Sequence, residues 1–223
     1  MKRLVVGLLL LNFASAALAV DQLALDNRIG MLTVKFEAMQ AKPDKRIPAG
    51  LLRQAQGIVL LDRTKAGFLF AYEGGSGVGM ARGPGAGAWS APVFVKANQV
   101  SVGFLAGGQK SFMVILLMTT NAVHRLASGS VRFGGEAAGT AGDVSGGTGT
   151  NFSSSEDGVL VFRDSQGLYG GAALKGGNVS PDTNADIIYY GQYLSADQIF
   201  FGHEAKPSIA AAHLARVIDQ YSK

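Results

Sequence analysis

The clearest hydrophobic pattern in the chain lies between Asp21 and Gln40, where apolar residues recur every three or four positions. This spacing predicts a helix with one apolar face, and the helix should end before Pro43 because proline cannot continue it. Two interpretations are open: the face packs on a sheet, or it enters a lipid interface. The residues that share the face are Leu25, Ile29, Leu32, Phe36 and Met39.

A second short helix is expected at 49–56, after which the pattern changes to short apolar runs typical of β-strands. The expected strands are 58–62, 66–73, 77–82, 88–95, 99–106, 111–118, one within 131–150, 159–163, 167–175 and 187–190. Turns are expected at Arg63–Lys65, in the glycine run 74–79, at 83–87 and at Gly107–Lys110. Further helices are predicted at 120–127, 195–201 and 209–221.

These elements predict an α+β fold with a curved or barrel-like, mainly antiparallel sheet and helices at both ends of the chain. The composition agrees, because 48% of the residues are hydrophobic and 31 are glycine. Glycine in strands permits tight curvature and close approach of layers. We therefore expect residues 20–223 to form a single domain.

Residues 1–19 have the three parts of a secretory signal: basic Lys2 and Arg3, an apolar run from Leu4, and small residues ending at Ala19. A membrane anchor would need about twenty apolar residues, and Asn12 interrupts the run. We expect cleavage near Ala19 and a protein of the periplasm or the exterior. Removal of Lys2 and Arg3 lowers the 20 basic residues to 18, against 16 acidic ones. This near balance gives no reason to expect a nucleic acid partner.

Motifs for chemistry are incomplete throughout the sequence. The segment from Gly103 to Ser111 has a glutamine where a phosphate-binding loop needs its lysine, and the glycines at 74–79 lack dinucleotide spacing. The chain has no cysteine, and its three histidines are too far apart in sequence for a helical zinc pair. We therefore expect no cofactor and no metal site. A hydrolase that uses Glu136 or Asp143 as its catalytic carboxylate is the weakest functional hypothesis.

Basic residues of the first half of the chain could form a local patch that holds anionic headgroups. Each such residue near a membrane surface contributes on the order of 1 kcal/mol. The alternative is that these are scattered, solvated charges. The candidate lipid-binding residues are Lys35, Lys42, Lys45, Arg46, Lys65 and Arg82.

Several motifs in order along the chain resemble the SYLF domain family, over about residues 25–205. The matching segments are Ile47–Pro48, Leu51–Ile58, Lys65–Phe68, Gly75–Gly77, Ala81–Arg82, Trp89–Pro92, Val131–Gly135, Ser165–Gly171 and Tyr190–Gly191. The resemblance implies a lipid-binding domain. Eukaryotic members bind phosphoinositides, partly through an N-terminal amphipathic helix, and some fungal members bind and bundle actin. Bacterial members are exported, so the implied ligand here is an envelope lipid.

The sequence thus favours an exported protein that binds lipid or a membrane surface without catalysis, through a basic, amphipathic N-terminal region. The implied partner is an anionic lipid or membrane surface. The alternative is a structural or interaction module that docks a protein partner in the envelope.

Overall fold

The computed structural model describes residues 22–67, 70–83, 87–102, 107–133, 152–155, 158–166, 177–202 and 204–223. The helices are α1 (Gln22–Gln40), α2 (Ala49–Gln54), α3 (Thr120–Ser128), α4 (Thr183–Tyr190), α5 (Ala196–Phe201) and α6 (Ile209–Tyr221). The strands are β1 (Gly57–Gly67), β2 (Phe70–Ala81), β3 (Val93–Val102), β4 (Gly107–Leu117), β5 (Val131–Phe133), β6 (Phe152–Ser155), β7 (Val159–Gln166) and β8 (Gly177–Pro181).

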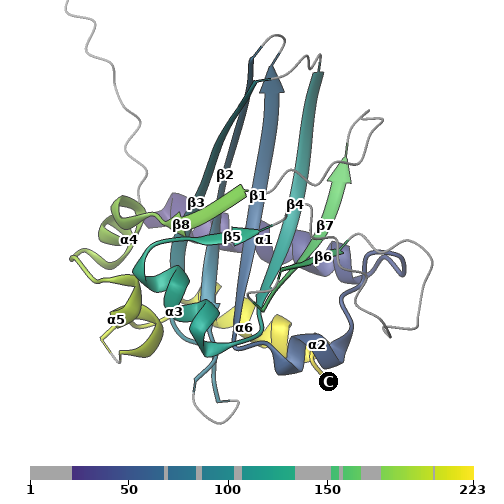
Figure 1. Cartoon of the computed structure of the whole chain (residues 1–223). Coiled ribbons are helices and arrows are strands. Elements are labelled where there is room, and N and C mark those ends of the chain that lie inside the picture. Colours follow the sequence, from purple (N-terminus) through teal and green to yellow (C-terminus); the bar gives the residue numbers. More distant parts are fainter. Residues whose placement is uncertain are drawn as a thin grey trace, which may run out of the picture.

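The eight strands form one antiparallel sheet in the order β5-β8-β3-β2-β1-β4-β7-β6 (Figure 1). The sheet curls so far that the edge strand β5 approaches β7, next to the opposite edge. Inside this curl the guanidinium carbon of Arg63 in β1 lies 5.0 Å from the ring centre of Phe133 in β5. The predicted fold class, a barrel-like antiparallel sheet with helices at both chain ends, is confirmed.

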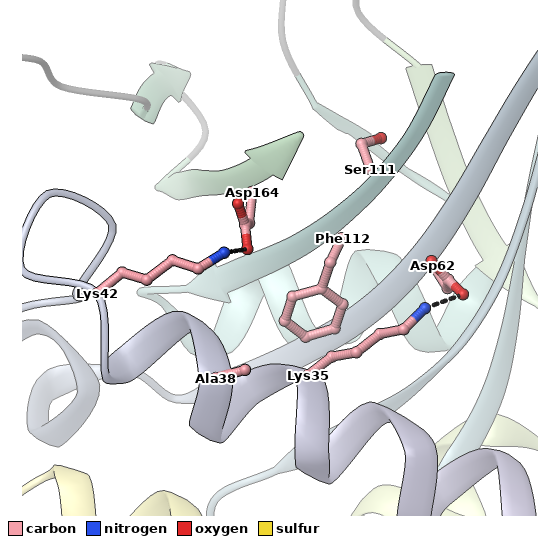
Figure 2. A pocket seen from close by; sticks show the side chains of 7 residues that line it. All are labelled: Lys35, Ala38, Lys42, Asp62, Ser111, Phe112 and Asp164. Carbon is pink, nitrogen blue, oxygen red and sulfur yellow. Dashed lines mark hydrogen bonds and ion pairs between the residues drawn. The ribbon is translucent and has the colours of Figure 1, made fainter. Parts of the chain in front are cut away.

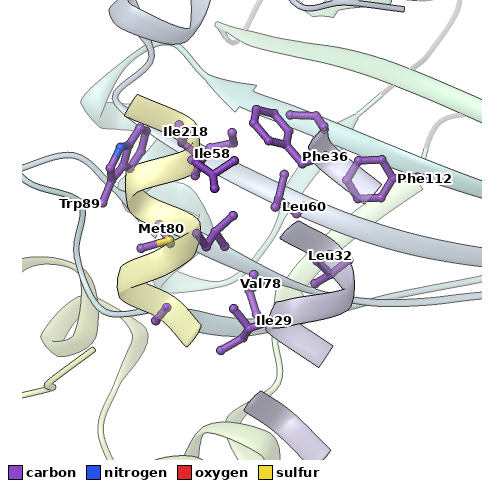
Figure 3. Close-up of a cluster of buried hydrophobic side chains, with 14 of the residues drawn as sticks. Ile29, Leu32, Phe36, Ile58, Leu60, Val78, Met80, Trp89, Phe112 and Ile218 are labelled. Atoms are coloured by element: carbon purple, nitrogen blue, oxygen red, sulfur yellow. The ribbon is translucent and has the colours of Figure 1, made fainter. Parts of the chain in front are cut away.

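One face of the sheet, here called the outer face, is covered by α1 and α6 (Figure 3). All five residues of the predicted apolar face of α1 are buried there, none more than 2% exposed. They pack with Ile58, Leu60 and Val78 from the strands and with Leu214 and Ile218 from α6. The first interpretation of the helix, an element laid on a sheet, is therefore confirmed for this face.

The inner face of the sheet has its own core, closed by α3 and α5. Alternation along β1 sends Val59 and Leu61 inward and Ile58 and Leu60 outward, as a strand with both faces buried requires. Arg63 continues the inward set and is 1% exposed. Its side chain occupies the space beside Gly75, where an added Cβ would lie 2.7 Å from the Arg63 Cγ.

Three predicted turns are wrong, because β1, β2 and β4 are longer than the apolar runs suggested. Arg63–Lys65 lies within β1, and the glycine run lies within β2, where Gly77 pairs with Leu61. Gly107–Lys110 begins β4, paired with residues 64–67 of β1. Charged residues and glycines are typical of turns, but here they lie inside strands. The glycines are suited to the strand interior because neighbouring backbone leaves no room for a side chain. An added Cβ at Gly77 would stand 2.0 Å from the Leu60 carbonyl oxygen.

The strand predicted at 187–190 is also wrong, because these residues belong to α4. The Asp182 side chain caps the helix by accepting from the backbone N–H of Ala185, and Gly191 ends it at φ 68°. Capping at both ends thus overrides the strand propensity of Ile187 and Ile188. The helices predicted at 49–56, 120–127, 195–201 and 209–221 are confirmed. The strand expected at 167–175 lies outside the described residues, as does most of 131–150.

Asp186 joins α4 to the edge of β3 where strand pairing with β8 ends. Its carboxylate accepts a hydrogen bond of 2.8 Å from the Phe94 N–H, and the Asp182 N–H donates to the Phe94 carbonyl. The side chain is 1% exposed. Burial raises the pKa of Asp186 to about 7; the Phe94 hydrogen bond opposes this and nearby Asp182 adds to it.

We predict that Gly77→Ala destabilises the fold by at least about 2 kcal/mol, because backbone of β1 occupies the space of the new methyl group. The matched control is Gly30→Ala in α1, where no atom lies within 4 Å of the added Cβ. Alanine favours a helix by up to about 1 kcal/mol over glycine, so the control should be neutral or stabilising. Urea unfolding of both variants checks this, and equal effects would contradict it.

We predict that Asp186 makes the protein less stable as the pH rises from about 4 to about 7. A carboxyl with a raised pKa in the folded state binds more protons there than in the unfolded chain, so its stabilising contribution is complete at low pH and is lost through that window. Asp186→Asn keeps an oxygen for the Phe94 N–H. It should abolish a loss in the free energy of unfolding, on the order of a few kcal/mol across this pH window. The measurement is the free energy of unfolding at pH 4.5, 6 and 8 for both proteins; parallel curves would refute the assignment.

Candidate functional site

A row of three side chains crosses the outer face of the sheet beneath α1. Asp62 of β1 is paired in register with Phe112 of β4, and Phe112 is paired with Asp164 of β7. Neighbouring strands lie about 4.8 Å apart, so the two aspartates stand about 10 Å from each other with Phe112 between them. The register of the sheet thus places a carboxylate on each side of one aromatic ring.

Two lysines meet these aspartates, Lys35 from α1 and Lys42 from the turn that follows α1 (Figure 2). Lys35 Nζ donates to Asp62 Oδ2 and Lys42 Nζ donates to Asp164 Oδ2, each at 2.5 Å. The last turn of α1 and the turn after it thus span the two strand spacings between the aspartates. This segment and the sheet present two ion pairs, one on each side of Phe112. We call this arrangement the paired-ion site.

A cavity of about 130 Å³ lies inside the paired-ion site. Phe112, which is 6% exposed, contributes to its lining, and Ala38 and Ser111 lie between the charged corners. The pairs differ in burial, since the side chain of Asp164 is 13% exposed and that of Asp62 is 40% exposed. Both lysine side chains are 42% exposed, so the site opens to solvent on the helix side.

The other predicted lipid-binding residues of the α1 end lie in the turn that follows the helix. Lys45 is 3.8 Å from the carboxylate of its neighbour Asp44, and Arg46 Nε donates to the Gln40 carbonyl oxygen at 3.0 Å. Arg46 is exposed. The structure thus groups Lys42, Lys45 and Arg46 at one end of α1, beside the paired-ion site.

Arg82 lies apart from this group, in a structural contact between β2, α2 and α6. Its guanidinium stacks 4.2 Å from the Trp89 ring centre and donates to the carbonyl oxygens of Leu52 and Ala55. Asp219 of α6 lies 3.7 Å from Arg82 and accepts from the Trp89 indole N–H at 2.9 Å. The Arg82 side chain is 8% exposed, so its charge is directed at the protein's own groups.

Lys65 is placed only through its backbone, which pairs with Glu73 and Gln109 in the middle of the sheet. The hydrolase candidates Glu136 and Asp143 lie outside the described residues. Within the described part of the chain, no group of three or more histidines or carboxylates is placed to hold a metal ion. No helix in that part is long and apolar enough to cross a membrane.

The side of α1 that faces away from the sheet, its outward face, is also apolar. Leu23, Met31 and Val34 are 68%, 61% and 64% exposed, and Ile209 at the start of α6 is 89% exposed. Between α1 and α6 runs a shallow groove of about 1080 Å³, whose rims carry Asp26, Glu37 and Arg216. Large exposed apolar patches on soluble domains mark binding surfaces. This face is separate from the five residues that the sequence identified, which are buried.

Sequence reasoning missed Asp62, Phe112 and Asp164. Each follows or lies within an apolar run, which suggests a strand, but the signal that joins them is the register of three strands. Asp62 and Asp164 are more than one hundred residues apart in the chain. Nothing local in the sequence pairs them.

A family model described as "Ysc84: Las17-binding protein actin regulator" matches residues 98–221, more than half of the chain. The chain belongs to this family. The resemblance to the SYLF domain is thereby confirmed. Within the Ysc84 match lie Phe112 and Asp164, whereas α1 and Asp62 precede it.

Curated relatives extend the similarity to most of the chain. SH3 domain-containing YSC84-like protein 1 of Xenopus laevis is 33% identical over 188 residues, which cover 81% of this chain and 54% of the relative. The human protein of the same name is 32% identical over 183 residues, 81% of this chain and 53% of the relative. LAS seventeen-binding protein 3 of Saccharomyces cerevisiae is 31% identical over 180 residues, 79% of this chain and 39% of the relative.

The chain therefore spans about half the length of its vertebrate relatives in the Ysc84 family. The names of these relatives describe an SH3 domain or a binding activity, and none of the three names an enzyme. No solved structure matches the chain.

We predict that Asp164→Asn costs about 1 kcal/mol of stability and that Asp62→Asn costs less, because the Lys42 pair is more buried and less screened by solvent. Urea unfolding at low salt measures the difference. In 1 M salt the cost of Asp62→Asn should shrink further, since exposed pairs are screened most. Equal costs at both salt concentrations would show that neither pair fastens α1 to the sheet.

Proposed function

We propose that this Ysc84-family domain binds lipid at a membrane surface through the outward face of α1 and the basic residues at its end. The observation that carries the proposal is the exposure of three large apolar side chains, Leu23, Met31 and Val34, on a helix whose opposite face is fully buried. The outward face of a surface helix is normally polar. An apolar outward face with basic neighbours suits the boundary between headgroups and acyl chains.

The basic part of the proposed surface lies where α1 ends. Lys42, Lys45 and Arg46 fall within five positions, and Lys35 is two turns earlier on the helix. Lys35, Lys42 and Lys45 each lie within ion-pair distance of an aspartate, whereas the hydrogen bond of Arg46 goes to a neutral carbonyl oxygen, so Arg46 supplies most of the net positive charge. Lys65 stays in the proposal as a residue of the family motif, whereas the contacts of Arg82 favour a role in holding the fold.

The rest of the proposal concerns the setting of this activity. We propose that the domain is exported after cleavage near Ala19, that it works in the periplasm or outside the cell, and that it acts without catalysis. The basis is the signal pattern of residues 1–19 together with binding names among the relatives. An anionic envelope lipid is the proposed ligand of the basic end.

A second candidate is a protein-docking module, which the groove between α1 and α6 favours. Its rims carry both signs of charge, Asp26 and Glu37 against Lys35 and Arg216, and mixed signs suit a protein partner better than a uniformly anionic surface. The family description names Las17 binding and actin regulation. Co-sedimentation of the purified protein with actin, or a stoichiometric complex with an envelope protein that excludes lipid, would favour this candidate.

We predict that the purified protein co-sediments with vesicles containing an anionic phospholipid, and that Lys45→Glu with Arg46→Glu weakens this binding by at least about tenfold. Each basic residue near such a surface contributes on the order of 1 kcal/mol, and its reversal adds repulsion. The matched control is Arg125→Glu with Arg132→Glu, which changes the charge equally at exposed positions of α3 and β5 rather than at the end of α1. The control should bind like the unchanged protein.

The apolar part has its own variant, Met31→Ser with Val34→Ser, which should reduce binding to anionic and to neutral vesicles alike. Both side chains are more than half exposed, so the fold should be retained, as circular dichroism would confirm. Binding that is unchanged in both double variants would refute the proposed surface. Equal loss in the control would show a general charge effect.

A further inference from the structure

We propose that the paired-ion site binds a zwitterionic group that carries a phosphate and an ammonium, as ethanolamine phospholipids do. This deepens the proposed function, because it names a ligand for a defined cavity at the same membrane-facing helix. The site itself does not depend on the outward face of α1. It is built from Lys35, Lys42, Asp62, Asp164 and Phe112.

The charges of the site are segregated by layer. The ammonium groups come from α1 (Lys35) and the turn after it (Lys42), and both carboxylates come from the sheet, one pair on each side of Phe112 (Figure 2). The four formal charges sum to zero, so a lone phosphate would gain two lysines but face two aspartates. A ligand with both signs satisfies all four groups: its phosphate lies toward the helix and its ammonium toward the sheet.

Phe112 strengthens the case for an ammonium on the sheet side. Its ring lines the cavity between Asp62 and Asp164, and the register of β1, β4 and β7 fixes this order. Cations are attracted to the faces of aromatic rings, and the attraction grows where water is excluded. An aromatic ring between two carboxylates is thus suited to recognise an amine.

The cavity is too large to be explained by one trapped water. Its volume is about 130 Å³, whereas a single water needs roughly 10–15 Å³ on the same measure. The lysine stems are long and flexible, and both side chains are 42% exposed. Each can turn from its aspartate toward a phosphate without movement of the backbone.

The simplest competing explanation is that the two ion pairs only fasten α1 to the sheet. Their matched spacing supports fastening, and the two roles are compatible. They differ in one respect: ion pairs that only hold α1 on the sheet would work in either orientation, whereas a zwitterion site needs the lysines on the α1 side and the aspartates on the sheet. A charge exchange within one pair therefore separates the two explanations.

The test is a titration of the isotope-labelled protein with O-phosphoethanolamine, followed by the backbone amide signals of Phe112 and Asp164 in NMR spectra. We expect saturable shifts at these residues, and at least about tenfold weaker binding of inorganic phosphate or ethanolamine alone, because each lacks one charge. Equal binding of phosphate alone, or no shift at the site, would overturn the proposal.

The variant is Lys42→Asp with Asp164→Lys, which keeps an ion pair but reverses it. We expect an unchanged melting temperature and at least about tenfold weaker binding of O-phosphoethanolamine. If this variant binds as well as the unchanged protein, the ion pairs only hold α1 on the sheet, and the proposal is wrong. Phe112→Leu, which keeps the apolar packing, should also weaken binding, by severalfold.

Vesicles distinguish a lipid source from a free metabolite. If vesicles of phosphatidylethanolamine compete with O-phosphoethanolamine at Phe112, the ligand is the lipid headgroup. If O-phosphoethanolamine binds but vesicles of any composition do not, the site stands and the proposed membrane function fails. If vesicles bind while O-phosphoethanolamine leaves the site unchanged, the membrane function stands and this proposal is wrong.

Discussion

The packing of α1 across the outer face of the sheet is the contact on which the rest of the molecule depends. It buries five large apolar side chains against β1, β2 and α6, and burial of each is worth on the order of 2 kcal/mol. The same contact fixes the rotation of the helix about its axis. That rotation directs Lys35 to Asp62, places the turn that carries Lys42 beside Asp164, and turns Leu23, Met31 and Val34 outward.

The two proposed binding surfaces are thus consequences of one helix orientation. A helix that is apolar on opposite sides would have no preferred side for the sheet if the sheet were uniform. The outer face is not uniform, because Asp62 pairs with Lys35 of α1 and Asp164 pairs with Lys42 of the turn after it. The ion pairs therefore select the orientation, while the apolar core supplies most of the stabilisation. Selection of this kind needs little net energy from each pair.

Much of the fold could be predicted from the sequence, because caps and periodic faces are local signals. Thr119 and Ser195 cap the first turns of α3 and α5, Pro43 follows the end of α1, and the apolar spacing of residues 25–39 marks the buried face. Strand lengths could not be predicted, since Arg63 and Gly77 are residue types common in turns. Their reasons for lying in strands are tertiary: Arg63 lies against Phe133 across the curled sheet, and Gly77 lies against the Leu60 carbonyl of the neighbouring strand. Of the candidate site, the lysines were identifiable by charge. Asp62, Phe112 and Asp164 were not, because strand register alone brings them together.

The contact between α1 and α6 has a consequence for the order in which the chain can fold. Phe36 of α1 packs edge-to-face against Tyr221 of α6, and Ser208 donates to Asp26. The outer core therefore cannot close until the chain has been synthesised through α6. Pairings so distant in sequence form slowly, and until then the apolar outer face of β1, β2 and β4 remains exposed. During that interval the exposed apolar surface makes the growing chain prone to aggregation.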